Sequence, residues 1–168
     1  SPVDPPAIVA WRVPVEQSLL GADVAATVVV PGIVYGHGRG IPALVAGGPR
    51  TEDGALTLIG DGRQHWVTVH VDDLAELYVQ LLEQGSGFGH VVAAAPGNPT
   101  VRELAAAVAG PAGVAAQDVA GTRARLGASF ADALLIDQGA DAARARALGW
   151  APRRPSLLDE FTRGSYAG

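Results

Sequence analysis

The chain has 168 residues, the length of one ordinary domain, and its mean hydropathy is +0.22. Apolar residues make up 48% and charged residues 17%, a composition that excludes an intrinsically disordered polypeptide. The chain has no cysteine, which excludes disulfides, thiolate metal sites and thiol nucleophiles. All twelve cationic side chains are arginine, so these residues supply neither a Schiff-base lysine nor a catalytic Tyr–Lys pair.

The net charge is −5, and the arginines are scattered along the chain. A nucleic-acid-binding protein concentrates basic residues on one face, so we expect no nucleic-acid partner. No apolar run approaches the roughly 18 residues of a membrane span, so we expect no membrane association. The lack of cysteine fits a reducing compartment, and we predict a cytoplasmic protein.

The first predicted helix covers residues 7–20, because apolar residues recur near the helical period at Ile8, Trp11, Val15 and Leu19. Pro14 lies inside this segment and predicts either a kink or a helix that starts anew there. Residues 25–30 follow as a continuously apolar segment, which is typical of a strand buried in a parallel sheet. A second buried strand is predicted over residues 89–95.

Between these two strands, the Gly60-Asp61-Gly62 turn separates two short predicted strands, residues 56–59 and 64–70. The clearest helix covers residues 71–84, with Asp72 and Asp73 in its first turn. Its apolar stripe predicts the burial of four leucines, each stabilising the fold by about 1.5–3 kcal/mol. The members of the stripe are Leu74, Leu77, Tyr78, Leu81 and Leu82.

The sequence from residue 100 onward is predicted to be mainly helical. A capping box, Thr100 to Glu103, opens a helix that runs to about residue 109. Alanine-rich helices are expected near residues 120–135 and 140–148, and a final helix over 156–163 begins at Ser156. Two buried strands among many helices indicate an α/β fold. Two strands do not close a sheet, so either others are hidden from the pattern or part of the sheet lies outside this chain.

Four motifs, taken in order, resemble the NAD(P)-dependent epimerase/dehydratase family, the extended or atypical short-chain dehydrogenases. Residues 28–36 (VVVPGIVYG) resemble its RPGxVYG stretch, and residues 67–75 (VTVHVDDLA) are similar to its fVhVdDlA segment. Residues 100–104 resemble its tvrEla helix start, and residues 147–152 its eLGW.P ending. The resemblance covers only the carboxyl-terminal half of such an enzyme.

This resemblance implies the later strands of a Rossmann-type parallel sheet plus a small helical substrate-binding lobe. We expect residues 1–168 to form a single unit. Residues 1–35 and 66–96 are expected to belong to the sheet, and residues 36–65 and 97–168 mainly to the lobe. The chain is then either a fragment or a natural short form of the family.

The resemblance places Pro31, Gly32, Ile33 and Val34 beside the nicotinamide ring of NAD or NADP. Binding of that cofactor requires the amino-terminal half, because the family's G-x-x-G-x-x-G turn holds the pyrophosphate there. The loop over residues 36–40 is G-x-G-x-G, and Ile41 stands where the next glycine is required. That loop is therefore interpreted as a connector.

The resemblance also bears on catalysis. Ile8 stands at the position of the family's catalytic tyrosine and Arg12 at that of its lysine, with Glu16 in register. Arginine stays protonated and serves no proton relay, so ordinary redox catalysis is in doubt. Arg12 and His37 remain as catalytic candidates.

The candidate substrate-binding residues are Tyr35, His37, Arg39, Trp66 and His70. Alternatively, His37 is a solvated loop residue and Trp66 fills the core.

Other polar residues near this segment receive structural interpretations. His70 and Asp72 have the alternate spacing of metal ligands, but no third ligand is evident, so we predict no metal. Asp73 is interpreted as a helix-start carboxylate that bonds to the loop at Tyr35, and Arg153 and Arg154 as surface charge.

The favoured function is the substrate-side portion of an NAD(P)-dependent epimerase/dehydratase-like oxidoreductase. Its substrate would be a nucleotide sugar or another small carbonyl or hydroxyl compound. The alternative is a truncated non-redox module that binds a small molecule or supports oligomerisation. An apolar strand at an open sheet edge predicts a homo-oligomer or association with the missing half.

Overall fold

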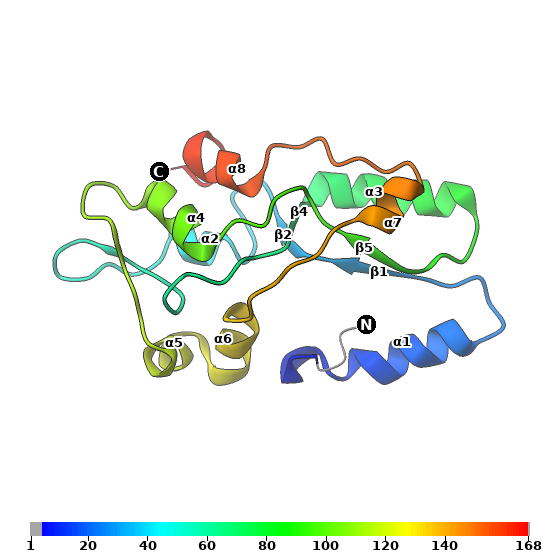
Figure 1. Ribbon diagram of the computed structural model, residues 1–168, viewed down its shortest axis with the longest axis horizontal. Helices are drawn as coiled ribbons and strands as arrows, with labels where there is room; N and C mark the ends of the chain where they lie inside the picture. The colour runs from blue at the N-terminus through cyan, green and yellow to red at the C-terminus, as the bar shows by residue number, and fades with distance from the viewer. Residues whose placement is uncertain (1–4, 168) are drawn as a thin grey trace.

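The computed structural model describes residues 5–167 and shows an α/β fold built on short parallel strands (Figure 1). Strand β1 (Thr27–Pro31) pairs with β5 (Gly89–Ala93), and β2 (Ile33–Tyr35) pairs with β4 (Thr68–His70). A third parallel pair joins β3 (Leu56–Thr57) to β6 (Val114–Ala115). The predicted fold class is confirmed. Residues 1–4 and 168, the ends of two of the predicted segments, lie outside the described residues.

Gly32 separates β1 from β2 and allows the chain to change partners. Its N–H donates to Ala93 O, and the N–H of Ile33 donates to Val67 O. A Cβ at Gly32 would lie 2.6 Å from Val67 O, so only glycine permits this approach. The change of partner places Tyr35 opposite His70 at the ends of β2 and β4.

Helix α3 (Val71–Gln84) has the predicted bounds and packs against the sheet. Leu74, Leu77 and Leu81 are buried, but Leu82 is 79% exposed, so the predicted burial of four leucines is wrong by one. Leu82 and Tyr78 instead line a shallow pocket against β1. This flank of the helix is not covered by the sheet.

A helical lobe lies at the other end of the strands (Figure 1). It contains α2 (Ala43–Ala46), α4 (Val101–Val108), α5 (Val119–Leu126), α6 (Ala128–Leu134) and α8 (Leu157–Arg163). The predicted capping box at Thr100 and Glu103 is formed, and Ser156 caps α8. The single helix expected over 120–135 is divided at Gly127, whose φ of 84° ends α5. Helix α7 (Ala143–Ala147) packs on β5.

The amino-terminal segment forms a 3-10 turn, η1 (Ala7–Val9), and then α1 (Arg12–Gly21). The helix therefore starts anew just before Pro14, which occupies the first turn, where a missing N–H leaves no helical bond unmade. The apolar residues of this segment are largely exposed: 66% at Trp11 and 55% at Val15. Between residues 5 and 167, none of the helices has both the length and the hydropathy needed to cross a bilayer.

The strands on either side of the Gly-Asp-Gly turn are shorter than predicted, and they do not pair with each other. Residues 64–67 are instead held by α4 and its approach, where Trp66 N–H donates to Pro99 O and Val101 N–H to Gln64 O. The turn thus connects the lobe to the main sheet.

Two leucines of α3 allow the packing to be tested. Leu77 is fully buried, so Leu77→Ala should lower the free energy of unfolding by about 2–5 kcal/mol through lost burial and a cavity. Leu82→Ala, on the exposed flank, should change it by no more than about 0.5 kcal/mol. Urea unfolding of both variants measures the difference. Equal losses would show that this flank is covered.

Candidate functional site

The carboxyl ends of β2 and β4 bring Tyr35 and His70 together. Their rings meet edge to face with centroids 5.2 Å apart. His70 is buried and also caps α3, because its Nδ1 accepts the backbone N–H of Asp72 at 3.1 Å. The strand end and the helix start are thereby joined in one rigid corner.

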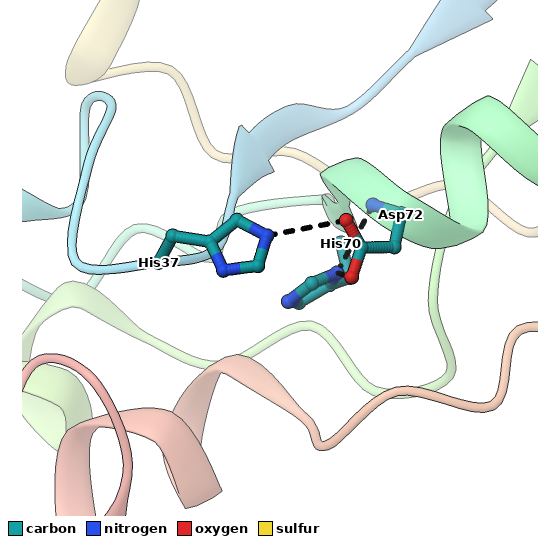
Figure 2. A group of neighbouring side chains, drawn as sticks. All are labelled: His37, His70 and Asp72. Atoms are coloured by element: carbon teal, nitrogen blue, oxygen red, sulfur yellow. Dashed lines mark hydrogen bonds and ion pairs between the residues drawn. The ribbon is translucent and has the colours of Figure 1, made fainter.

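His37 approaches this corner from the loop that follows β2 (Figure 2). Its Nε2 lies 3.2 Å from Oδ1 of Asp72, and its ring centroid lies 5.5 Å from that of His70. The hydrogen bond with His37, followed by the charges of His70, His37 and Arg154, holds the pKa of Asp72 below its usual value. His37 is therefore a third candidate ligand beside His70 and Asp72. The sequence spacing had related only those two residues.

Glycine at position 36 makes this arrangement possible. A Cβ there would lie 2.8 Å from Nε2 of His70, and the φ of Gly36 is 135°. His37 itself has a φ of 55° and is the one non-glycine residue with positive φ among residues 5–167. Such a conformation is uncommon for a side-chain-bearing residue and persists where surrounding contacts impose it.

Those contacts come from the segment after α8. Gly36 N–H donates to the Tyr166 hydroxyl at 2.9 Å, and Gly38 N–H donates to Ser165 Oγ at 2.8 Å. Ser165 in turn donates from its N–H and Oγ to Glu160, which lowers the pKa of that carboxyl. Sequence reasoning missed these three residues. The partners are 127 and 130 residues apart, and no local pattern joins them.

Tyr35, a predicted substrate residue, points into the protein. Its hydroxyl donates to Pro155 O at 2.7 Å, and only 2% of the residue is exposed. Burial, with the charge of Asp73, raises the pKa of the phenol far above its usual value. Tyr35 therefore stays protonated and holds the site in place.

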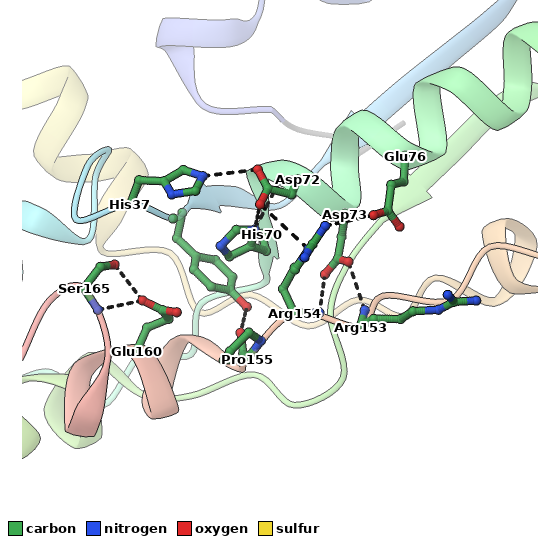
Figure 3. Close-up of polar contacts among 12 residues, drawn as sticks. His37, His70, Asp72, Asp73, Glu76, Arg153, Arg154, Pro155, Glu160 and Ser165 are labelled. Atoms are coloured by element: carbon green, nitrogen blue, oxygen red, sulfur yellow. Dashed lines mark hydrogen bonds and ion pairs between the residues drawn. The ribbon is translucent and has the colours of Figure 1, made fainter.

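Asp73 is buried and accepts the backbone N–H groups of Arg153 and Arg154 at 2.9 and 3.1 Å (Figure 3). The prediction that it bonds to the loop at Tyr35 is wrong, because its carboxylate faces the chain that crosses the helix start. The Arg154 side chain pairs with Glu76 at 3.0 Å and approaches Asp72 at 3.8 Å. Arg153 and Arg154 are exposed, as expected of surface charge.

The remaining predicted residues are spread around the fold. Trp66 is fully buried, donates from Nε1 to Leu134 O at 3.0 Å and has no surface for a ligand to touch. Arg39 is exposed in the loop beside His37. Arg12 pairs with Glu16 and lines a different cavity, of about 490 Å³, with His90. The structure thus gathers Tyr35, His37 and His70 and leaves Arg12 and Trp66 elsewhere.

Residues 31–34, the predicted nicotinamide contacts, run from the end of β1 into β2 and are partly exposed. The loop after them leads to α2, a helix of four residues that begins only at Ala43. The connection from β2 to α2 is thus not a strand–turn–helix unit of the kind that cradles a pyrophosphate.

Comparison with known proteins identifies the wider fold. No family model matches the chain. A putative GDP-L-fucose synthase 2 from Oryza sativa is 38% identical over 126 residues, covering 70% of this chain and 33% of that protein. Human epimerase family protein SDR39U1, solved with NADPH, is 26% identical with a TM-score of 0.65, covering 86% of this chain and 50% of the human one.

These matches relate the chain to the NAD(P)-dependent epimerase/dehydratase family. The chain spans about a third of the curated relative and about half of the solved relatives. UDP-glucose 4-epimerase from Thermotoga maritima, solved with UDP-glucose, shares the fold with a TM-score of 0.58 at 18% identity, covering 90% of this chain and 48% of that one. The chain thus matches half of the Rossmann-type fold of these relatives.

Asp73 offers a test of how the site is held. Asp73→Asn leaves one oxygen for two backbone donors and should lower the free energy of unfolding by about 1.5–3 kcal/mol. Glu76→Gln removes an exposed carboxylate of the same helix and should cost no more than about 1 kcal/mol. Thermal unfolding followed by circular dichroism measures both. Similar small losses would show that the Asp73 contacts are not needed to hold residues 153–154.

Proposed function

We propose that the chain is the substrate-side half of an NAD(P)-dependent oxidoreductase or epimerase that acts on a nucleotide sugar or a related small carbonyl or hydroxyl compound. One observation carries the proposal: polar groups from the β2 loop, the end of β4 and the start of α3 converge at the carboxyl ends of parallel strands. Ligands of open α/β sheets bind at that edge. The names of the relatives, a GDP-L-fucose synthase and a UDP-glucose 4-epimerase, favour a nucleotide sugar.

Within this site, His37 and Arg39 are the predicted substrate residues that solvent reaches. Arg39 carries a permanent positive charge next to the cluster, which suits a nucleotide diphosphate. Of the two catalytic candidates, His37 lies in the site and Arg12 does not. Any proton transfer would then involve His37 or a group from the other half of the fold.

NAD or NADP is the cofactor we propose, because the human relative was solved with NADPH. Residues 31–34 are uncharged and partly exposed, which suits contact with a nicotinamide ring. When bound, the cofactor would accept and return a hydride. Its phosphates would be held by the half of the fold that residues 5–167 do not contain.

The open edge of β1 supports a fold in which strands from a second half continue the sheet. Gly89 N–H donates to Ala26 O, and Gly32 N–H donates to Ala93 O. Because bonding directions alternate along a strand, the backbone groups of Thr27 and Val29 face away from β5. In the described part of the chain, β1 pairs with β5 alone. We propose that further parallel strands add here, beside the apolar flank formed by Tyr78 and Leu82.

The alternative, a non-redox module that binds a small molecule or self-associates, is favoured by the exposed apolar residues of the amino-terminal segment that forms η1 and α1. Trp11 and Val15 are more than half exposed, and together with Ile8 and Leu19 they follow a helical period. A second copy would bury this stripe. Sedimentation at several concentrations shows whether it does.

The nucleotide-sugar proposal predicts a specific binding pattern. In a titration of ¹⁵N-labelled chain with UDP-glucose, we expect amide shifts at residues 35–39 and 70–72. Arg39→Gln should weaken binding about tenfold through loss of a charged contact. Arg63→Gln, which removes another exposed arginine from a different loop, should leave it unchanged. Shifts confined to other surfaces, or none at all with UDP-glucose or GDP-mannose, would contradict the proposal.

The cofactor proposal predicts that the chain by itself does not bind the dinucleotide tightly. The chain by itself should show no saturable micromolar binding of NAD(H) or NADP(H) in calorimetry, because most dinucleotide affinity comes from the pyrophosphate cradle. Tight binding to these 168 residues would mean that the cradle is formed in a way the fold does not show.

A further inference from the structure

We propose that His37, His70 and Asp72 form a binding site for a divalent transition-metal ion of the Zn²⁺ class. One ring nitrogen from each histidine and one oxygen of Asp72 lie within 4.8 Å of one another. Figure 2 shows the three side chains converging from a loop, a strand end and the first turn of a helix. Two imidazoles and a carboxylate are a donor set that suits Zn²⁺, Co²⁺, Ni²⁺ or Fe²⁺.

The spacing is close to what a metal requires. Metal–ligand bonds of about 2.0–2.2 Å place ligand atoms no more than about 4 Å apart. His37 Nε2 already lies 3.2 Å from Oδ1 of Asp72, and His70 Nδ1 lies 3.8 Å from Oδ2. A shift of less than an ångström in the exposed His37 side chain would complete the set.

The protonation of His70 is compatible with ligation. Its Nδ1 accepts the N–H of Asp72, so this nitrogen carries a lone pair and Nε2 carries the hydrogen in the neutral ring. A metal bound at Nδ1 would use the same tautomer and replace that one hydrogen bond. That replacement would leave the N–H of Asp72, in the first turn of α3, without its cap, a cost that ion binding has to exceed.

The loop that carries His37 is fixed by hydrogen bonds, while the site itself is accessible to solvent. His37 keeps its left-handed conformation because the loop amides on both sides of it are bound by Tyr166 and Ser165. The His37 side chain is 66% exposed, so three protein ligands leave a coordination position for water or a substrate oxygen. A metal there would polarise an oxygen of a bound small molecule.

Neighbouring charges act in opposite directions on a cation. Glu160 interacts electrostatically with both histidines and favours a bound cation. Arg154 Nε lies 3.8 Å from Oδ2 of Asp72 and opposes it. Because the Arg154 backbone, and not its side chain, is held by Asp73, its side chain can be changed without disturbing that contact.

Cobalt binding to the full 168-residue chain tests the proposal. The chain has no cysteine and four histidines, so background binding is small. We expect one equivalent of Co²⁺ to give a visible d–d spectrum that Zn²⁺ abolishes by competition. His37→Gln and Asp72→Asn should each weaken binding about tenfold or more, and Arg154→Gln should tighten it several-fold.

His65→Gln is the matched control. His65 is also exposed and lies 2.8 Å from a carboxylate, that of Asp137, but it has no second histidine beside it. Its loss should leave Co²⁺ affinity unchanged. Circular dichroism and the unfolding temperature of each variant show that the fold is retained. No cobalt spectrum, or equal losses in the His37 and His65 variants, would overturn the site. The test uses no nucleotide sugar, so its outcome is independent of the function proposed above.

Discussion

The change of partner at Gly32 is the constraint on which the site depends. The strand that pairs with β5 up to Pro31 pairs with β4 from Ile33 onward, and the approach to Val67 leaves no space for a Cβ. Because side chains alternate along a strand, this register alone decides which residues of β2 and β4 face each other. It places Tyr35 opposite His70, and the loop that carries His37 begins from there.

Contacts from the carboxyl-terminal segment fix the position of this site. Three parts of the segment bind three different elements: residues 153–154 bind Asp73 of α3, Pro155 accepts from Tyr35 of β2, and residues 165–166 hold the loop of His37. Figure 3 shows Asp73 with its contacts to residues 153–154, next to the polar cluster. In most of these hydrogen bonds one of the two partners is a backbone group. They therefore fix the path of the chain more than they select particular side chains.

Local patterns predicted what is local. Helix α3 has its predicted bounds because its stripe, its two early aspartates and its closing Gly85 all act within one segment, and the capping box at Thr100 formed for the same reason. The site itself was predicted only in part. Tyr35, His37 and His70 were named, but nothing in the sequence relates a loop histidine to Asp72, 35 residues later, or Asp73 to residues 153–154, 80 residues later. The exposure of Leu82 was missed because periodicity gives a helix's apolar face, while the width of the sheet decides how much of that face is covered.

The position of β4 explains why so small a sheet can hold a precise cluster. Trp66, just before the strand, belongs to the core beneath the lobe, while Val67 and Val69 belong to the core beneath α3. This segment is thus packed in both cores, and any movement of its end would disturb both. His70 is the last residue of that strand and the cap of α3, so its imidazole is fixed from two directions. His37 is held by the backbone bonds of its loop and by one hydrogen bond from its exposed side chain to Asp72. A fixed His70 facing an adjustable His37 can close on a bound ion or substrate. The movement is then confined to His37, on the side that solvent reaches.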